Sequence, residues 1–164
     1  DLHQEGARLT VTDIDPERVQ RCVDDFGATA VAPDEIYTVD ADIFAPCALG
    51  AVINDETLKV FKFDIIGGAA NNQLERSHHG QQVADAGILY VPDYVINAGG
   101  LINVYGELQE WSPERSKRKA GEIYSTLLQI FERAQEEGVP TAVAADRVAE
   151  HRIQRARHLQ RSWV

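Results

Sequence analysis

The sequence holds no methionine, only two cysteines and no long apolar run. Without a run of about 18 apolar residues, it predicts no membrane-spanning helix. Two cysteines that lie 25 positions apart do not make the dense disulfide framework of a small secreted protein, so we interpret them as reduced thiols of a cytoplasmic protein. The lack of methionine, together with an opening that resembles the end of a helix, predicts a piece of a longer protein.

Basic side chains are scarce in most of the chain. Residues 1–113 carry 6 basic and 19 acidic side chains, whereas residues 114–164 carry 10 basic and 7 acidic ones. Because nucleic acids are bound through clustered lysine and arginine, the acidic part argues against a nucleic-acid partner. The basic end is predicted to be a helix with arginines all around it, which favours a solvated face or an acidic partner surface over RNA.

Short apolar stretches alternate with helical patterns before Asn97, and only helical patterns follow it. Strands are expected at 8–13, 29–31, 43–45, 64–66 and 88–91. Helices are expected at 16–26, 54–61, 76–86, 98–109, 113–137 and 141–157. Alternation of this kind is typical of parallel strands joined by helices. We therefore predict an α/β fold, a Rossmann-like doubly wound parallel sheet followed by carboxyl-terminal helices.

Small and polar residues follow three of the expected strands, at 45–49, 67–72 and 97–100. Open parallel sheets bind ligands just beyond the carboxyl ends of their strands. Glycines let backbone or ligand come close, and Asn71 and Asn97 offer donors and acceptors that suit a carboxamide. Together the stretches predict a slot for a nicotinamide ring, although each one alone fits a tight turn equally well.

An acidic residue ends the first expected strand. Asp13 would accept hydrogen bonds from the adenosine ribose and repel a 2′-phosphate, which favours NAD over NADP. The alternative is an ordinary capping or turn aspartate, but Asp15 is better placed to cap the helix that begins at Pro16. The fingerprint G-x-G-x-x-G is absent from the sequence, so the phosphate-binding turn and the first strand of the sheet are expected before Asp1.

The remaining histidines and cysteines predict no metal site and no nucleophile. His78 and His79 are adjacent in a polar helix, where neighbouring side chains point to different faces, so we interpret both as surface residues. His151 and His158 lie among arginines, whose positive charges would repel a bound metal cation. Cys47 has no histidine in a motif relation to it and is interpreted as a small packing residue.

Four stretches carry a family resemblance: Val11-Thr12-Asp13-Ile14-Asp15, Phe44-Ala45-Pro46-Cys47-Ala48-Leu49-Gly50, Gly68-Ala69-Ala70-Asn71-Asn72-Gln73, and Gly87 through Val104. In them the chain resembles the carboxyl-terminal, nucleotide-binding half of the amino-acid dehydrogenases. These are the leucine, valine and phenylalanine dehydrogenases, with glutamate dehydrogenase as a more distant relative. The likeness covers nearly the whole chain, most loosely after Trp111. It implies reversible, NAD-dependent oxidative deamination of an apolar L-amino acid, with leucine or another branched-chain amino acid first and phenylalanine or valine next.

The resemblance also implies residue roles. Cofactor contacts would come from Asp13, Ala48, Leu49, Ala69, Ala70, Asn71 and Asn97, and substrate contacts from Asn71, Leu101 and Val104. Val104 is apolar where glutamate-specific relatives carry a hydroxyl. Leu101 is bulkier than the valine associated with leucine dehydrogenases and would narrow the pocket. The base lysine of the family, a second lysine and an aspartate belong to the amino-terminal domain, so no catalytic residue is expected here. The lysines of this chain are interpreted as surface residues: Lys59, Lys62, Lys117 and Lys119.

The same resemblance implies a domain division. Residues 1–110 would form the dinucleotide-binding domain, incomplete at its amino end, and residues 111–164 a helical segment that packs back on the amino-terminal domain. The chain alone would be inactive, and the whole enzyme a cytoplasmic homo-oligomer of branched-chain amino-acid catabolism. The alternative is a truncated, non-catalytic nucleotide-binding module, and the sequence upstream of Asp1 would discriminate between the two.

Overall fold

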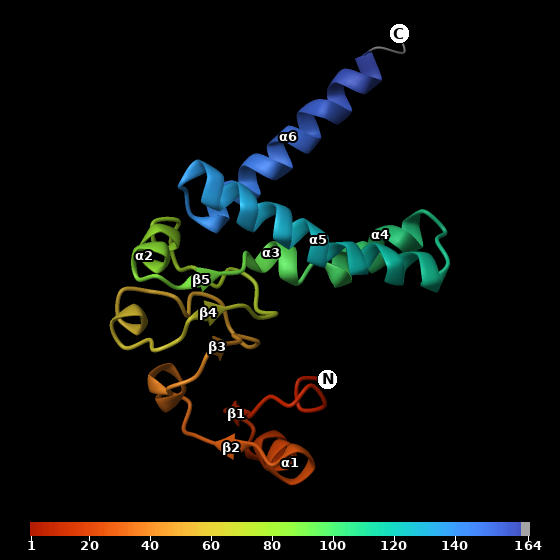
Figure 1. Cartoon of the computed structure of the whole chain (residues 1–164). Helices are drawn as coiled ribbons and strands as arrows, with labels where there is room; N and C mark the ends of the chain where they lie inside the picture. Colours follow the sequence, from red (N-terminus) through yellow and green to blue (C-terminus); the bar gives the residue numbers. More distant parts are fainter. Residues whose placement is uncertain (162–164) are drawn as a thin grey trace. The chain divides into compact units, whose positions relative to one another are not determined.

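The computed structural model describes residues 1–161 (Figure 1). The chain forms two compact units. The first comprises Asp1–Asp40 and Val60–Lys62, and the second comprises Ala41–Lys59 and the chain from Phe63 onward. Each unit contains its own sheet, and both sheets are parallel.

The first unit is a single β-α-β element followed by a short 3-10 helix. Strands β1 (Thr10–Val11) and β2 (Thr29–Ala30) pair in parallel and are joined by α1 (Pro16–Phe26). The predicted strands are present but short, because only the residues that face the partner strand enter the ladder. The 3-10 helix η1 (Glu35–Thr38) was not predicted.

The predicted limits of α1 are confirmed. Asp15 caps the helix, since its carboxylate accepts a hydrogen bond from the backbone N of Glu17 at 3.0 Å, and Pro16 is the first helical residue. Gly27 ends the helix with a φ of 62°, in the left-handed region that glycine adopts without strain. Both limits depend on chemistry within one helical turn, which explains why the sequence pattern located them.

Three parallel strands form the sheet of the second unit in the order β3-β4-β5, with bounds Ile43–Phe44, Ile65–Ile66 and Leu89–Tyr90. Phe44, Ile66 and Tyr90 occupy one row of the register and are all buried. Ile43 and Leu89, on the opposite face, are exposed. Burial therefore alternates along each strand, and the core of this unit lies on the face that Phe44 shares with Ile66 and Tyr90.

The helices that connect these strands are shorter than the expected 54–61 and 76–86. They are the 3-10 helix η2 (Thr57–Lys59) and the α-helix α2 (His79–Asp85). The helix expected from residue 76 begins at His79 because the ring Nδ1 of His79 accepts a hydrogen bond from the backbone N of Arg76 at 3.0 Å. That bond holds the preceding residues in a turn.

Four helices follow β5: α3 (Asp93–Ile96), α4 (Gly99–Leu108), α5 (Pro113–Glu137) and α6 (Thr141–Arg161). The predicted bounds of α5 are confirmed, with Ser112 as its N-cap and Gly138, at a φ of 62°, as its C-cap. In contrast, α3 was not predicted: no element was expected between the strand that ends at Val91 and the helix from residue 98. Helix α6 is longer than the expected 141–157.

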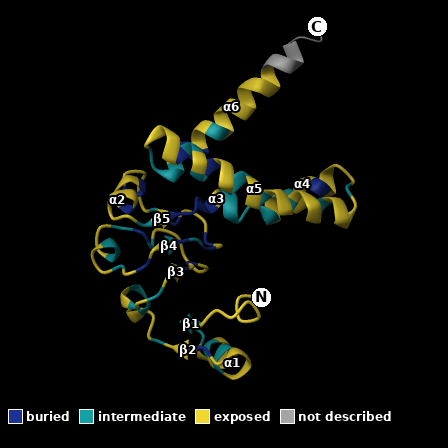
Figure 2. Ribbon diagram, viewed as in Figure 1, coloured by how far each residue is buried: buried dark blue, intermediate teal, exposed yellow. Residues whose placement is uncertain are grey.

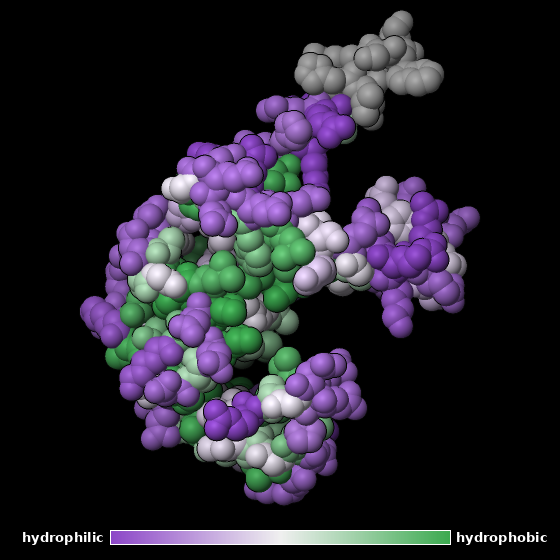
Figure 3. All heavy atoms as spheres, viewed as in Figure 1, coloured by the Kyte–Doolittle hydropathy of each residue, from purple (hydrophilic) through white to green (hydrophobic). Residues whose placement is uncertain are grey.

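A small core joins α5 and α6 (Figure 2): Ile130, Ala134, Ala144 and Ala145, packed against Val95, Phe131, Val139 and Val148. The start of α6 is also tied to the sheet, because the hydroxyl of Thr141 donates to the carbonyl of Tyr90 at 2.6 Å. In Figure 3, apolar residues gather over the part of this unit that holds β4, β5 and α3. The first turns of α6 thus belong to the same packed unit as the sheet.

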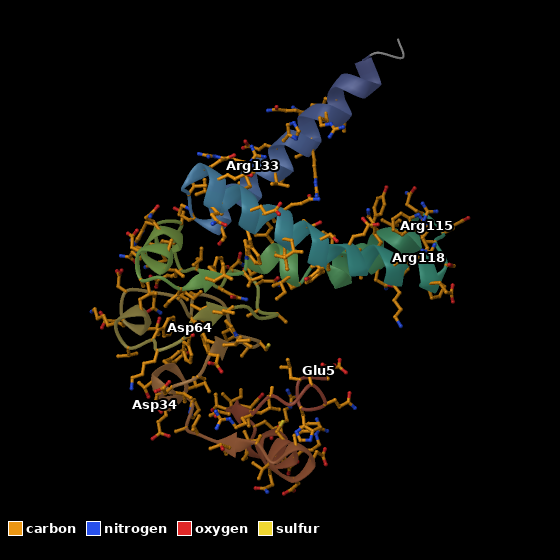
Figure 4. All side chains as sticks on the ribbon, in the orientation of Figure 1. Glu5, Asp34, Asp64, Arg115, Arg118 and Arg133 are labelled. Carbon is orange, nitrogen blue, oxygen red and sulfur yellow. The ribbon has the colours of Figure 1, made fainter. Side chains whose placement is uncertain are left out.

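Charged contacts close the turn between α5 and α6. Glu137 accepts a hydrogen bond from Arg133 at 2.6 Å, and a further one from Arg147. Arg133 is labelled on α5 in Figure 4. The bond from Arg147, followed by that from Arg133, lowers the pKa of Glu137 below its ordinary value of 4.5.

The expected α/β class with parallel strands is confirmed. The doubly wound, Rossmann-like arrangement remains a prediction, as does the division at residue 110. Among the residues that the structure describes, no helix combines the length and apolar character needed to cross a membrane.

Candidate functional site

The loops that leave β3 and β4 are joined to each other in the second unit. The backbone N of Ala70 donates to the carbonyl of Pro46 at 2.9 Å. A Cβ on Gly68 would lie 2.2 Å from that same carbonyl oxygen, and one on Gly50 would lie 2.6 Å from the carbonyl oxygen of Asn71. The two glycines therefore permit a backbone approach that any side chain would prevent.

Asn97 adds the end of the β5 segment to these loops. Its side-chain Nδ2 donates to the carbonyl of Ala69 at 3.3 Å and to Oδ1 of Asn71 at 2.6 Å. Since both acceptors are oxygens, the amide nitrogen of Asn97 must face them. This leaves Oδ1 of Asn97 as an acceptor and Nδ2 of Asn71 as a donor. No other hydrogen bond of the described chain uses either atom. The predicted meeting of the three strand ends is present in this unit.

The other predicted cofactor residues of this unit differ in exposure. Ala48 and Ala69 are exposed, as is Leu49, at 79%. Ala70 is only 4% exposed, so of these four residues it presents the least surface to a ligand. Cys47, interpreted as a packing residue, is exposed.

The predicted substrate residues lie on α4. Leu101 is 73% exposed and Val104 is 55% exposed. A short turn at Asn97 and Ala98 separates α3 from α4: the backbone N of Asn97 closes α3 on the carbonyl of Asp93, and that of Ile102 opens α4 on the carbonyl of Ala98. Leu101 and Val104 are one turn apart on α4, so they share one face of that helix.

Asp13 belongs to the first unit and follows β1. Its Oδ1 accepts a hydrogen bond from the backbone N of Asp15 at 2.9 Å, and its side chain is exposed. Its other carboxylate oxygen makes no hydrogen bond within the described residues. Asp15 caps α1, as predicted. The bond from the backbone N of Asp15 to Asp13 is that of a turn aspartate, so a ligand role for Asp13 stays a prediction.

Two buried polar residues support the joined loops, and the sequence pattern did not identify them. Gln73 is fully buried, and its Nε2 donates to the carbonyls of Gly68 at 2.8 Å and Ala70 at 3.0 Å. Asp93, 8% exposed, accepts from the backbone N of Gln73 at 3.1 Å and from that of Tyr94 at 2.8 Å. A signal was present, since both residues lie in stretches that carry the family resemblance.

The interpretation of His79 as a surface residue is wrong. Its side chain is fully buried, and its Nε2 lies 3.3 Å from Oδ1 of Asp55. Asp55, His78 and His79 each offer a ligand atom within 4.8 Å of the others. However, Nδ1 of His79 already accepts from a backbone N–H, so the neutral ring carries its proton on Nε2 and donates it to Asp55. A metal ligand needs that nitrogen unprotonated, so the arrangement fits a structural hydrogen bond better than a metal site.

The electrostatics of Asp55 agree with a structural role. A hydrogen bond from Gln82, together with contributions from His79 and His78, lowers the pKa of its carboxyl below the ordinary value.

Two of the four lysines are paired on the surface, Lys59 with Glu56 and Lys119 with Glu122. Both pairs are exposed, as the sequence predicted for the lysines.

A separate hollow of about 480 Å³ lies between α5 and α6. Acidic and basic side chains line it together, including Glu132, Glu136, Arg152 and Arg155. Because both signs of charge are present, the hollow selects no ligand charge. The ends of the strands remain the better candidate site.

Comparison with known proteins places this geometry in a family. A leucine dehydrogenase of Bacillus subtilis is 56% identical over 99% of this chain and 45% of its own length. A valine dehydrogenase of Streptomyces albus is 46% identical over 95% of this chain and 44% of its own length. The crystal structure of L-tryptophan dehydrogenase from Nostoc punctiforme superposes with a TM-score of 0.93, at 51% identity, over 96% of this chain and 47% of that one.

This chain thus spans less than half the length of the curated relatives that it matches. The family model for glutamate/leucine/phenylalanine/valine dehydrogenases matches residues 7–161. The match includes the loops that meet at Asn71 and Asn97, and also the strand end at Asp13. The chain belongs to the glutamate/leucine/phenylalanine/valine dehydrogenase family.

Proposed function

We propose that this chain is the carboxyl-terminal, NAD-binding half of an enzyme that oxidatively deaminates an apolar L-amino acid. The reversible reaction yields a 2-oxo acid and ammonia, and leucine or another branched-chain amino acid is the first candidate substrate. The observation that carries the proposal is the amide pair of Asn71 and Asn97 at the joined strand ends.

The amide pair complements a primary carboxamide. Because both N–H groups of Asn97 are engaged, the carbonyl oxygen Oδ1 is the part of its amide that remains available, and it would accept from the carboxamide NH₂ of the nicotinamide. Nδ2 of Asn71 remains a donor, for the carboxamide oxygen or for the substrate. Leu101 and Val104, which share a face of α4, would supply the apolar contacts to the substrate.

The pairing of the strands supports a Rossmann-like sheet. In the order 3-2-1-4-5-6 of such sheets, removal of the central strand 1 leaves the groups 3-2 and 4-5-6. The observed groups are β2-β1 and β3-β4-β5. We therefore propose residues 1–110 as the incomplete dinucleotide-binding domain and residues 111–164 as the helical segment that meets the amino-terminal domain.

When bound, NAD⁺ supplies the acceptor for the hydride that leaves the amino-acid α-carbon. The residues of this chain would orient the cofactor and select the cofactor and the substrate. Asp13 would hold the adenosine ribose, while Ala48, Leu49, Ala69 and Ala70 would line the cofactor site. No lysine or other base is assigned from this chain, since the family resemblance locates the proton-transferring groups in the amino-terminal domain.

The preference for NAD follows from the charge of Asp13. Its exposed carboxylate would accept a bond from a ribose hydroxyl and repel a 2′-phosphate. We expect Asp13→Ala in the full-length enzyme to lower the ratio of kcat/KM for NAD over NADP by about tenfold or more, because each 1.4 kcal/mol of repulsion removed is worth about a factor of ten. Asp25→Ala, which removes an exposed carboxylate from α1, is the matched control. An unchanged ratio in Asp13→Ala would show that Asp13 does not select the cofactor.

The substrate is tested with the full-length enzyme in both directions. Leucine, valine, isoleucine, phenylalanine and tryptophan, with the matching 2-oxo acids, cover the apolar range. Neighbouring substrates should overlap, because a methylene group is worth only about 1–3 kcal/mol. The main alternatives are a phenylalanine or valine dehydrogenase. NAD binding without turnover of any amino acid would instead favour the non-catalytic module.

We also propose that the whole protein is a cytoplasmic homo-oligomer that acts on small molecules and uses neither nucleic acid nor a membrane. The acidic character of residues 1–113 supports the exclusion of nucleic acid. Light scattering coupled to size-exclusion chromatography would measure the subunit number, and a monomeric full-length protein would contradict this part of the proposal.

A further inference from the structure

Gln73 and Asp93 form a buried polar link below the proposed nicotinamide site. Burial of an amide or a carboxylate is costly unless the group is hydrogen-bonded. Gln73 is fully buried and Asp93 is 8% exposed, so neither presents its side chain to solvent. We infer that these two are positioning residues, which set the carbonyl of Ala69 and the amide of Asn71 against Asn97. This inference rests on the proposed function.

The two N–H groups of Gln73 explain the direction of the Ala69 carbonyl. Gln73 binds the carbonyls of Gly68 and Ala70, at 2.8 and 3.0 Å, and Ala69 lies between these two residues. With both neighbours turned toward Gln73, the carbonyl of Ala69 is the one that reaches Asn97, at 3.3 Å. The buried side chain thus presents one selected backbone oxygen to the site.

Asp93 connects this loop to the helix that carries Asn97. Its carboxylate accepts from the backbone N of Gln73 at 3.1 Å, and its own carbonyl accepts from the backbone N of Asn97 at 3.0 Å. A single residue is therefore bonded to Gln73 through its side chain and to Asn97 through its backbone, and Gln73 in turn binds the loop that bears Asn71. A shift at Asp93 would move Asn97 relative to Ala69 and Asn71.

The chemistry at position 73 requires a neutral donor. The NH₂ of Gln73 lies between two carbonyl oxygens, while its Oε1 is buried and has no partner within the described residues. Glutamate would place a negative oxygen against those carbonyls. Methionine would keep the length of the side chain and remove both donors. Asn in place of Asp93 would keep the volume and lose one of the two accepted bonds.

The test uses the full-length enzyme with two cofactors, NAD⁺ and its 3-acetylpyridine analogue. The analogue replaces the carboxamide NH₂ by a methyl group, so it cannot donate to Oδ1 of Asn97. We expect Gln73→Met and Asp93→Asn to lower kcat/KM with NAD⁺ by roughly 10- to 100-fold, the range for a misplaced binding group. With the analogue the loss should be clearly smaller, because the analogue cannot make the bond to Oδ1 of Asn97 and keeps only the oxygen that Nδ2 of Asn71 could reach.

Two controls separate the possible outcomes. Gln135→Met changes an exposed glutamine of α5 in the same way and should leave both cofactors unaffected. In an Asn97→Ala background, Gln73→Met should cost little further activity with NAD⁺, which would couple the two residues. Asp93→Asn, which preserves volume, carries the test if Gln73→Met does not fold.

Equal losses with both cofactors in a folded variant would overturn the inference and leave Gln73 and Asp93 as structural residues. That result is distinct from failure of the proposed function, in which the unmodified enzyme would oxidise no amino acid with NAD⁺. In that second case both proposals fall together. Cofactor-selective losses in both variants would establish the positioning role.

Discussion

Substitution of Gly68 by alanine tests whether the close approach of the two loops holds the site together. A Cβ at position 68 would lie 2.2 Å from the carbonyl oxygen of Pro46 and 2.5 Å from the nitrogen of Pro46. Ordinary contact begins at 3.4 Å, so the loops must separate by roughly 1 Å. Because the opposing atoms are backbone, no side-chain rotation can relieve the clash.

The cost of Gly68→Ala follows from two contributions. Overpacking of a well-packed site costs about 1–3 kcal/mol. Loss of the hydrogen bond from Ala70 to Pro46 adds about 1 kcal/mol. We therefore expect a destabilisation of about 2–4 kcal/mol and a weaker affinity for NAD, because the loop that bears Asn71 moves away from its neighbour.

Urea unfolding of the full-length protein, followed by circular dichroism and repeated with NAD, would measure this change. Gly121→Ala is the matched control, since it lies inside α5 with nothing within 4 Å of the added Cβ. There alanine should stabilise the helix by up to about 1 kcal/mol. A destabilisation of less than about 0.5 kcal/mol for Gly68→Ala, with unchanged NAD affinity, would refute the reasoning.

Three further predictions concern stability and selectivity. Residues 1–164 expressed alone should aggregate or stay partly unfolded, because within residues 1–161 β1 pairs with β2 alone and β3 with β4 alone, which leaves unpaired strand edges. A sharp cooperative melt of a monomer would contradict this. Glu137→Gln should be less stable than the unmodified protein at neutral pH. This gap, the difference in stability between the two proteins, should close as the pH falls below about 4.5, because a carboxyl group with a lowered pKa stabilises the fold only while it is charged. Thermal melts across this pH range would measure it, and a gap independent of pH would count against the contacts with Arg133 and Arg147. Leu101→Val should raise kcat/KM for phenylalanine relative to leucine by about tenfold, since one methylene is removed from the pocket wall; an unchanged ratio would place Leu101 outside the pocket.

Local chemistry made several elements predictable. The limits of α1 and α5 follow from Asp15, Gly27, Ser112 and Gly138, each of which interacts within one turn of its own helix. The parallel strands were found from short apolar stretches, although their paired lengths were not. Paired length depends on the neighbouring strand, which the local pattern does not describe.

Other features depend on partners far away in the chain. His79 reads as a surface residue in its polar helix, yet the fold buries it and sets it against Asp55, 24 positions away. The backbone N of Gln73 is bonded to the carboxylate of Asp93, 20 positions away. Neither contact can be seen in the spacing of apolar residues along the sequence, because that spacing indicates which face of an element is buried and not which residues lie opposite it.

The candidate site shows the same division. The sequence alone determined that small and amide-bearing residues follow the strands, and that Asn71 and Asn97 are suited to a carboxamide. Only the tertiary structure decided which atoms of these amides remain available, because that choice depends on the Ala69 carbonyl. Hydrogen-bond direction is settled by the groups that the fold brings within about 3 Å of each other, and these groups come from separate strand ends.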